Sequence, residues 1–431
     1  MKYKSNNIKE NDIFRNKNNP QKDLNCKEIV VKEFNKKKQK KTSLNYLFKY
    51  SKRIKLVYIK TTIIDIIIKY LFFYVFANAS NVFNSYIILK MRGIGEFSIY
   101  SETYTNTPDV IIINNKTIEE KINKYNFKQF DNSVKLIWYS TITSCLSLFS
   151  GCSNIYEIDL SNFNTSKVSD ISYMFNGCKQ LYSLDISFLD VSKVRDIRYL
   201  FKGCSSLTYI NMSNFRAGSL NYISYAFQSC TKLRSLDLSN FNTSKIISLR
   251  GLFEGCSSLT FLNLSNFDTS HVTRMQSIFC NCSSLISIDL SSFNTSNVGN
   301  MDNMFFGCSS LNYLNLSNFD ISKVSRMNNI FNGCKSLKYI NLRNFHNNKG
   351  IDDTISNIFA NMNDNIVICY NNIKENDIIF SKIKNKPCFV IDCSNDWASI
   401  QNYIKNELDK YLLCESVSLN NILCKKCKDN Y

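Results

Sequence analysis

Histidine is scarce in this sequence, and the short motifs that mark most catalytic sites are missing. The chain of 431 residues holds two histidines, His271 and His346. It contains no nucleophile elbow, no phosphate-cradling glycine loop and no cluster of metal ligands at a recognised spacing. We therefore expect a protein that is not an enzyme and that uses no cofactor or metal.

Acidic residues are also in deficit, but the deficit is local. The chain has 53 Lys and Arg against 35 Asp and Glu, and residues 1–60 alone hold 18 basic and 5 acidic residues. Residues 1–55 are rich in Lys and Asn and poor in apolar residues, which predicts a disordered basic arm. Because the rest of the chain is nearly balanced, the charge does not predict a nucleic-acid partner.

An apolar segment at residues 56–79 follows the arm, and charged residues interrupt it at Lys60, Asp65 and Lys69. A basic flank, a short apolar run and the small residues Ala77 and Ala79 are the parts of a signal peptide, or of a signal anchor with its basic arm in the cytosol. A buried helix of a globular domain is the alternative, since the charges weaken a membrane span. The export reading predicts a secreted or cell-surface protein, with membrane association possible through 56–79.

A cysteine recurs every 26 residues through the middle of the chain. Self-similarity at a fixed period indicates a repeat protein in which each repeat stacks on its neighbours to bury its apolar face. The eight positions are Cys152, Cys178, Cys204, Cys230, Cys256, Cys282, Cys308 and Cys334.

Each repeat has two apolar patterns separated by a turn. Counted from the cysteine, aliphatic residues stand at the third, sixth and eighth positions, and Phe or Leu at the eleventh. Further on, apolar residues recur three, three and one apart, as in Val272, Met275, Ile278 and Phe279, which favours a short α- or 3₁₀-like segment. We therefore expect an α/β repeat: a right-handed leucine-rich-repeat solenoid over residues 149–345, with parallel strands on a concave face.

The repeat motifs F-x-G-C-S-S-L and L-S-N-F-x-T-S-x-V resemble those of the BspA-like leucine-rich-repeat surface proteins. The resemblance covers a little under half of the chain. Ser229 and Asn281 depart from it by replacing the glycine before the cysteine, and the Thr-Ser turn is missing near Ala217. The resemblance implies a secreted or surface-attached protein of adhesion or recognition.

Two flanking regions complete the predicted organisation. Short β-like runs over residues 80–148 predict a β-rich cap for the first coil, which would otherwise expose strand edges and core. Residues 346–431 are predicted to contain the last coil, a C-terminal cap and a cysteine-rich tail. The tail cysteines favour disulfides after export, with zinc at the C-x-x-C pair as the weaker reading; they are Cys369, Cys388, Cys393, Cys414, Cys424 and Cys427.

The cysteine ladder itself is expected to be structural. Each of its cysteines lies three residues after a core Phe and three before a core Leu or Ile. In such surroundings a free cysteine behaves as a small buried hydrophobe, which we favour over bridges between coils or metal binding.

The strand face carries the candidate binding residues. Because strand side chains alternate, the fifth and seventh residues after each cysteine should point outward. Exposed aromatics framed by Asp, Asn and Ser predict a contact strip for a protein or glycan ligand, although Asp and Asn could instead serve solubility or backbone hydrogen bonding. The strip residues are Tyr209, Phe261, Tyr313, Tyr339, Asp185, Asp237 and Asp289.

Two functions follow from these features. The first is a secreted or membrane-tethered recognition or adhesion protein that binds host or neighbouring cell surfaces through the solenoid. The second is an intracellular scaffold for protein–protein interaction that uses the same solenoid, with reduced cysteines throughout.

Overall fold

The computed structural model describes residues 85–216, 220–345, 357–363 and 366–370, and the backbone of three short strands within 389–424. The chain divides into two compact units, Met1–Val82 and Phe83–Tyr431, and every described residue belongs to the second. The predicted basic arm and the apolar segment 56–79 therefore lie outside the described residues. Within the residues that the structure describes, no helix is long and apolar enough to span a membrane.

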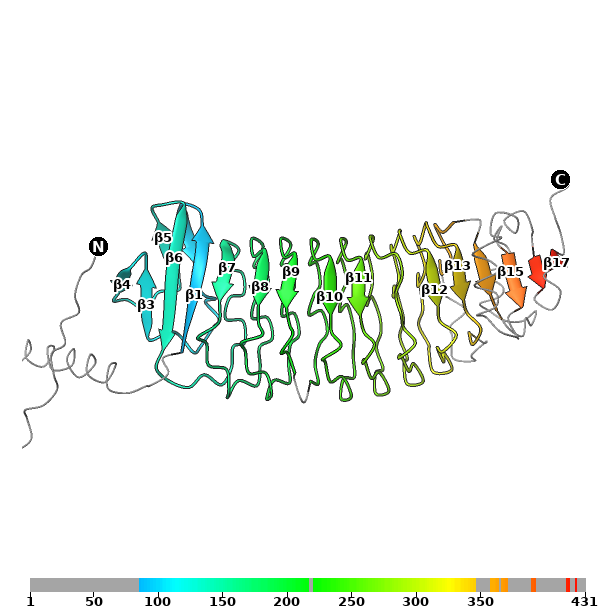
Figure 1. Ribbon diagram of the computed structural model, residues 1–431, viewed down its shortest axis with the longest axis horizontal. Coiled ribbons are helices and arrows are strands. Elements are labelled where there is room, and N and C mark those ends of the chain that lie inside the picture. The colour runs from blue at the N-terminus through cyan, green and yellow to red at the C-terminus, as the bar shows by residue number, and fades with distance from the viewer. Residues whose placement is uncertain are drawn as a thin grey trace, which may run out of the picture. The chain divides into compact units, whose positions relative to one another are not determined.

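An antiparallel sheet precedes the first coil (Figure 1). Alternate residues of its strand β1 (Ser85–Arg92), namely Ile87, Leu89 and Met91, are fully buried. The first strand of the solenoid, β7, pairs antiparallel with β1, so the sheet covers the edge that the first coil would expose. In order along the sheet the strands are β4 (Lys116–Ile118), β3 (Val110–Ile113), β6 (Asp131–Trp138), β1 (Ser85–Arg92) and β7 (Ile155–Asp159), and β2 (Gly95–Ser98) pairs with β5 (Lys124–Phe127) beside it.

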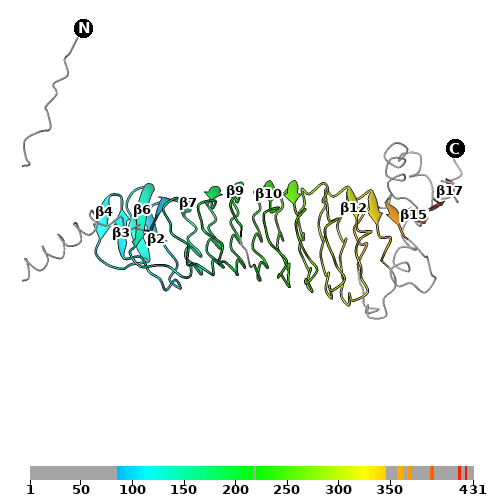
Figure 2. The same cartoon turned by 60° about the horizontal axis from the view of Figure 1, so that its bottom comes forward.

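Most of the solenoid coils place a short strand on the same side, as Figures 1 and 2 show. Neighbouring strands pair parallel in β8–β9, β10–β11 and β12–β13, with residues 26 apart in register. The coil of residues 285–290 keeps its place in the row without forming a strand. The bounds are β8 (Ser183–Asp185), β9 (Tyr209–Asn211), β10 (Ser235–Asp237), β11 (Phe261–Asn263), β12 (Tyr313–Asn315) and β13 (Tyr339–Asn341).

The parallel pairing of strands continues past residue 345, which was the predicted end of the regular repeats. Phe359 comes 28 residues after Phe331, yet its ring stacks on that of Phe331 with centroids 5.8 Å apart. The coil therefore absorbs two extra residues without losing its place in the core. The further strands are β14 (Val367–Cys369), β15 (Phe389–Asp392) and β16 (Ser416–Ser418), all parallel, and β17 (Leu423–Cys424), which is antiparallel.

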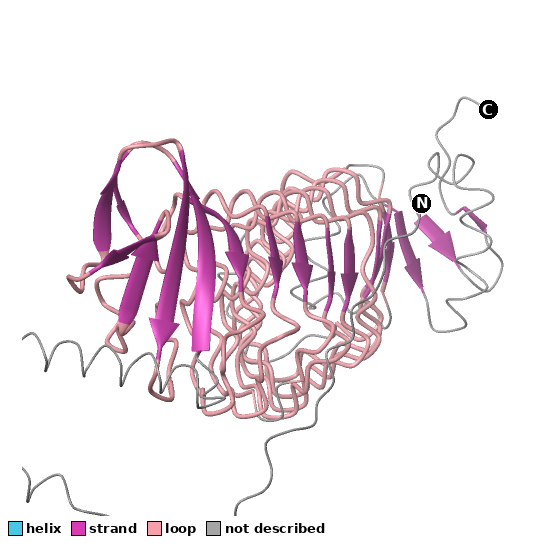
Figure 3. Ribbon diagram, turned by 60° about the vertical axis from the view of Figure 1, so that its left-hand side comes forward, coloured by secondary structure: helices cyan, strands magenta, loops and turns pink. Residues whose placement is uncertain are grey.

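The described residues contain no helix, so the predicted α/β leucine-rich-repeat fold is wrong: the second unit is a β-solenoid (Figure 3). The side of each coil opposite the strands consists of successive turns. There, alternate backbone N–H groups donate to the next coil, as Phe253 does to the Ile278 oxygen at 2.9 Å and Gly255 to the Cys280 oxygen at 2.7 Å. In a helix, the same N–H groups would instead donate to carbonyl oxygens four residues earlier in the same segment.

Residues with left-handed backbone conformation explain why the α- or 3₁₀-like segment that the apolar spacing predicted does not form. Two residues per coil, four apart, have positive φ, for example Ser277 (58°) and Asn281 (59°). A right-handed helix cannot include such residues. The three, three and one spacing of Val272, Met275, Ile278 and Phe279 therefore arises from tandem turns, whose inward corners happen to recur at nearly helical intervals.

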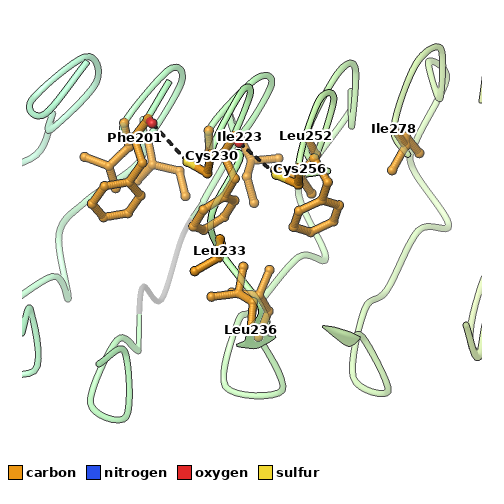
Figure 4. Packing of buried hydrophobic residues seen from close by; sticks show 14 of the residues in the cluster. Phe201, Ile223, Cys230, Leu233, Leu236, Leu252, Cys256 and Ile278 are labelled. Atoms are coloured by element: carbon orange, nitrogen blue, oxygen red, sulfur yellow. Dashed lines mark hydrogen bonds between the residues drawn. The ribbon is translucent and has the colours of Figure 1, made fainter. Parts of the chain in front are cut away.

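Stacked rings form the centre of the core. One phenylalanine per coil packs on its equivalent in the next coil, with ring centroids 5.4 to 6.0 Å apart. Leucines and isoleucines from the strands and turns surround them, as the close view around Cys230 and Leu233 shows (Figure 4). Each coil thus buries its apolar face only against two neighbours. The stacked set is Phe149, Phe175, Phe201, Phe227, Phe253, Phe279, Phe305, Phe331 and Phe359.

Candidate binding face

The strand face is the outward surface made by residues four, five and seven after each ladder cysteine. In β11, Phe261 is 58% exposed while the next residue, Leu262, is buried. In β9, Tyr209 is likewise 58% exposed beside buried Ile210. The alternation of strand side chains thus brings these two aromatic rings to the surface.

The four aromatic residues of the predicted strip do not form one continuous patch. Tyr209 lies opposite Ser183 across its strand pair, and Phe261 lies opposite Ser235. Tyr313 and Tyr339 are direct neighbours, half-buried, with ring centroids 6.5 Å apart. The structure therefore brings together the last two rings and separates the first two by coils that carry serine.

The three aspartates of the strip share a local structural task. In each, Oδ1 accepts the backbone N–H of the serine two residues on, at 2.9 Å for Asp185, Asp237 and Asp289. This is an Asx-turn, which closes the bend that follows the strand. The hydrogen bonds with Ser291 lower the pKa of Asp289. The aspartates are therefore surface residues that also shape the backbone.

Asp185 has an additional partner in the next coil. Its Oδ2 accepts a hydrogen bond from Asn211 Nδ2 at 3.0 Å. Partial burial raises the pKa of Asp185, but the hydrogen bonds from Ser187 and Asn211 outweigh it and leave the pKa below its ordinary value. The carboxylate therefore stays ionised at neutral pH.

Three exposed apolar residues on or beside the strand face were not predicted. Tyr182 and Ile286, each four residues after a ladder cysteine, are 47% and 52% exposed. The strands begin one residue later, so the fourth position still belongs to the turn and also faces outward. Phe188, 57% exposed, stands where other coils have an asparagine such as Asn266, whose Nδ2 donates to the Ser239 oxygen at 2.8 Å. The replacement of that asparagine by Phe188 could have predicted this exposed ring from the sequence.

The ladder cysteines are buried and their thiols are free. From Cys178 onward, each Sγ donates to the backbone oxygen of a core phenylalanine in the preceding coil at 3.0 to 3.3 Å, as Cys256 does to Phe227 (Figure 4). Burial raises the pKa of Cys204 and Cys256 to about 12. These buried thiols are therefore protonated at neutral pH, which makes them poor nucleophiles.

Cys280, two residues before the ladder position, is also buried, and burial raises its pKa to about 12. Cys369, in β14, differs from the ladder because it is disulfide-bonded. For Cys424 only the backbone in β17 is described, and Cys388, Cys393, Cys414 and Cys427 lie outside the described residues. Among the described side chains, no group of His, Cys, Asp and Glu could hold a metal ion.

The turn side of the solenoid offers a second aromatic cluster. Tyr173, Tyr199 and Tyr225 occupy left-handed positions and stack with ring centroids 4.5 and 5.0 Å apart. The Arg250 guanidinium lies 5.5 Å from the Tyr225 ring. Because these rings cover one another, a ligand would reach mainly their edges, whereas no ring among the described residues stacks on Tyr209 or Phe261. The strand face is therefore the stronger candidate site.

One family of known proteins is similar to this chain. Its description reads "Mycoplasma protein of unknown function, DUF285", and its model matches residues 116–233, 143–260 and 247–367. The overlapping matches extend together from residue 116 to residue 367, which is more than half of the chain. No curated protein matches the sequence.

Proposed function

The chain belongs to the family described as "Mycoplasma protein of unknown function, DUF285", and from that premise we propose that it is a non-enzymatic recognition or adhesion protein. Its ligand is a protein or a glycan, and its binding site is the strand face. The observation that carries this proposal is the pair of exposed rings of Tyr209 and Phe261, presented from a scaffold whose coils are hydrogen-bonded to each other on both sides. Bare aromatic rings on a rigid surface are favourable contact points for a partner.

The binding proposal is tested with the purified chain on panels of immobilised glycans and matrix proteins. We expect a double variant, Tyr209→Ser with Phe261→Ser, to lose at least about tenfold in affinity for the best ligand, because buried aromatic anchors dominate recognition. The matched control is Ile247→Ser, since Ile247 is 53% exposed and lies on the turn side of the coil. Equal binding by the double variant and the control would show that the strand face is not the site.

The location is a separate part of the proposal: the protein is exported, as a secreted or surface-bound form. The support is the basic, apolar and small-residue pattern that ends at Ala79, together with the resemblance of the repeats to BspA-like surface proteins. We expect N-terminal mapping of the protein from cells to find a start at Ser80, or Met1 in the membrane fraction. A soluble form that begins at Met1 contradicts export and favours the intracellular scaffold.

A further inference from the structure

Between Ser183 and Asn315 the strand face has a period of two coils, which ends where Tyr339 and Asn341 repeat the pair of Tyr313 and Asn315. At the fifth and seventh positions after the cysteine, Ser with Asp alternates with an aromatic residue and Asn. The alternation runs through Ser183 and Asp185, Tyr209 and Asn211, Ser235 and Asp237, Phe261 and Asn263, Ser287 and Asp289, and Tyr313 and Asn315. The same kind of side chain therefore returns every 52 residues rather than every 26.

The backbone pairing follows the same period. The two-stranded sheet β8–β9 places Ser183 beside Tyr209 and Asp185 beside Asn211. The next one, β10–β11, places Ser235 beside Phe261 and Asp237 beside Asn263. Each two-stranded sheet is thus one copy of a surface unit with a small, acidic half and an aromatic, neutral half.

This period sets the spacing of the exposed rings. Neighbouring coils of such a stack lie about 4.8 Å apart, so Tyr209 and Phe261, which are two coils apart, lie roughly 10 Å from each other along the row. The residue at this position in the coil between them is Ser235, which is small and leaves both rings exposed. A linear polymer lying along the row would meet an aromatic surface at each such interval.

We propose that the ligand of the strand face is an uncharged, extended β-1,4-linked glycan that runs along the row of coils. This inference rests on the proposed function and narrows its ligand class. One disaccharide of such a glycan is about as long as two coils, so every second sugar meets an aromatic ring. The apolar faces of sugar rings stack on Tyr209 and Phe261, and the sugar between them faces Ser235 and Asp237.

The aspartates select this ligand over a proline-rich peptide of similar period. A polyproline helix rises about 3.1 Å per residue with three residues per turn, so its repeat of roughly 9 Å also matches the rings. A carboxylate, however, can only accept hydrogen bonds. Prolines have no N–H to donate, whereas each sugar carries hydroxyl donors.

The aspartates also disfavour a charged glycan. Asp237 and Asp289 are exposed, and each uses Oδ1 for its own turn. Together with Asp185, Glu157 and Asp159 they give the described strand face five negative charges, against the two positive charges of Arg234 and Lys338. This surplus repels polysaccharides that carry carboxylates or sulfates.

The test measures binding of the full chain to β-1,4-linked glucose and N-acetylglucosamine oligomers of two, four and six sugars by titration calorimetry. For at least one series, we expect affinity to rise on the order of tenfold when the oligomer first spans both rings, between two and four sugars. In Phe261→Ala this rise disappears, while binding of the disaccharide through Tyr209 persists. Ile247→Ser keeps the rise. An Asp237→Asn variant, which removes one negative charge from the strip, should gain binding to an anionic glycan such as hyaluronan oligomers.

Three results would overturn the inference. The first is an affinity that does not depend on oligomer length. The second is a rise in affinity with length that persists in Phe261→Ala. The third is tight binding of a ten-residue polyproline peptide when no glycan binds. If the strand-face double variant loses binding to a folded protein ligand while no oligosaccharide binds, the proposed function stands and only the glycan assignment fails. If the double variant binds its ligands like the control, both fail.

Discussion

Raising the pH above about 9 should unfold the solenoid cooperatively, because its core contains a row of protonated thiols. Burial raises the pKa of Cys152, Cys204, Cys256 and Cys334 to about 12, from 9.0. The unfolded chain loses these protons near pH 9 and the folded chain near pH 12. A group whose pKa is raised by folding contributes its full stability below the unfolded pKa and loses it as the pH rises toward the folded pKa.

The expected effect is large because the thiols act together. Each thiol lowers the free energy of unfolding by about 1.4 kcal/mol per pH unit within this window. Eight ladder thiols therefore give a slope on the order of 10 kcal/mol per pH unit, comparable with the whole stability of a typical domain. The remaining four, Cys178, Cys230, Cys282 and Cys308, have pKa values raised by burial in the same direction.

The measurement is urea unfolding followed by circular dichroism at a series of pH values from about 7 to 11. A double variant, Cys204→Ala with Cys256→Ala, should show a slope smaller by about 3 kcal/mol per pH unit, since two of the thiols are removed. Thiol titration of the folded chain at pH 8 should leave the ladder unreacted until denaturant is added. A stability that stays level from pH 8.5 to 11, or ladder thiols that react in the folded chain, would contradict this account.

Removing one ring from the phenylalanine stack should be the most damaging single truncation in the core. Phe253 lies between Phe227 and Phe279, with ring centroids 5.7 and 5.9 Å away, and is fully buried. We expect Phe253→Ala to lower the free energy of unfolding by about 3 to 5 kcal/mol, through lost burial and the cavity that remains. Both neighbouring interfaces lose contacts, so the damage extends beyond one coil.

The matched control for this truncation is Phe261→Ala, which makes the same chemical change eight residues away in the same coil. The Phe261 side chain is 58% exposed, so we expect its loss to change the free energy of unfolding by less than about 1 kcal/mol. Chemical denaturation of the two variants beside the unaltered chain gives both values. If the two substitutions lowered the free energy of unfolding by similar amounts, the Phe261 side chain would have to be packed against other parts of the protein. The binding proposal would then lose its main support.

Much of the organisation could be read from the sequence because it depends on periodicity. The 26-residue interval of the cysteines marks the coils, and it identifies Leu262 as inward and Phe261 as outward within one strand. Hydrophobic burial acts on each coil in the same way, so a position that is apolar in every repeat faces the core. The aromatic residues of the candidate site could therefore be predicted from the sequence.

Other features required interactions that a one-dimensional pattern does not contain. Phe359 stacks on Phe331, which shows that the coil accommodates two extra residues. Core packing, and not the 26-residue register, determines the position of Phe359. Tyr313 and Tyr339 contact each other while Tyr209 and Phe261 stand apart. The sequence identified all four rings as outward, but cross-strand neighbours decide which of them remain open to a ligand.

By itself, the sequence determined that this protein is a stack of 26-residue coils with buried cysteines, leucines and phenylalanines. Only the tertiary structure decided that the far side of each coil is a series of turns instead of a helix. Apolar residues spaced three, three and one apart satisfy either geometry. The outcome depends on where the backbone N–H groups find acceptors, and here every second one, as in Phe253 and Gly255, finds its acceptor in the next coil.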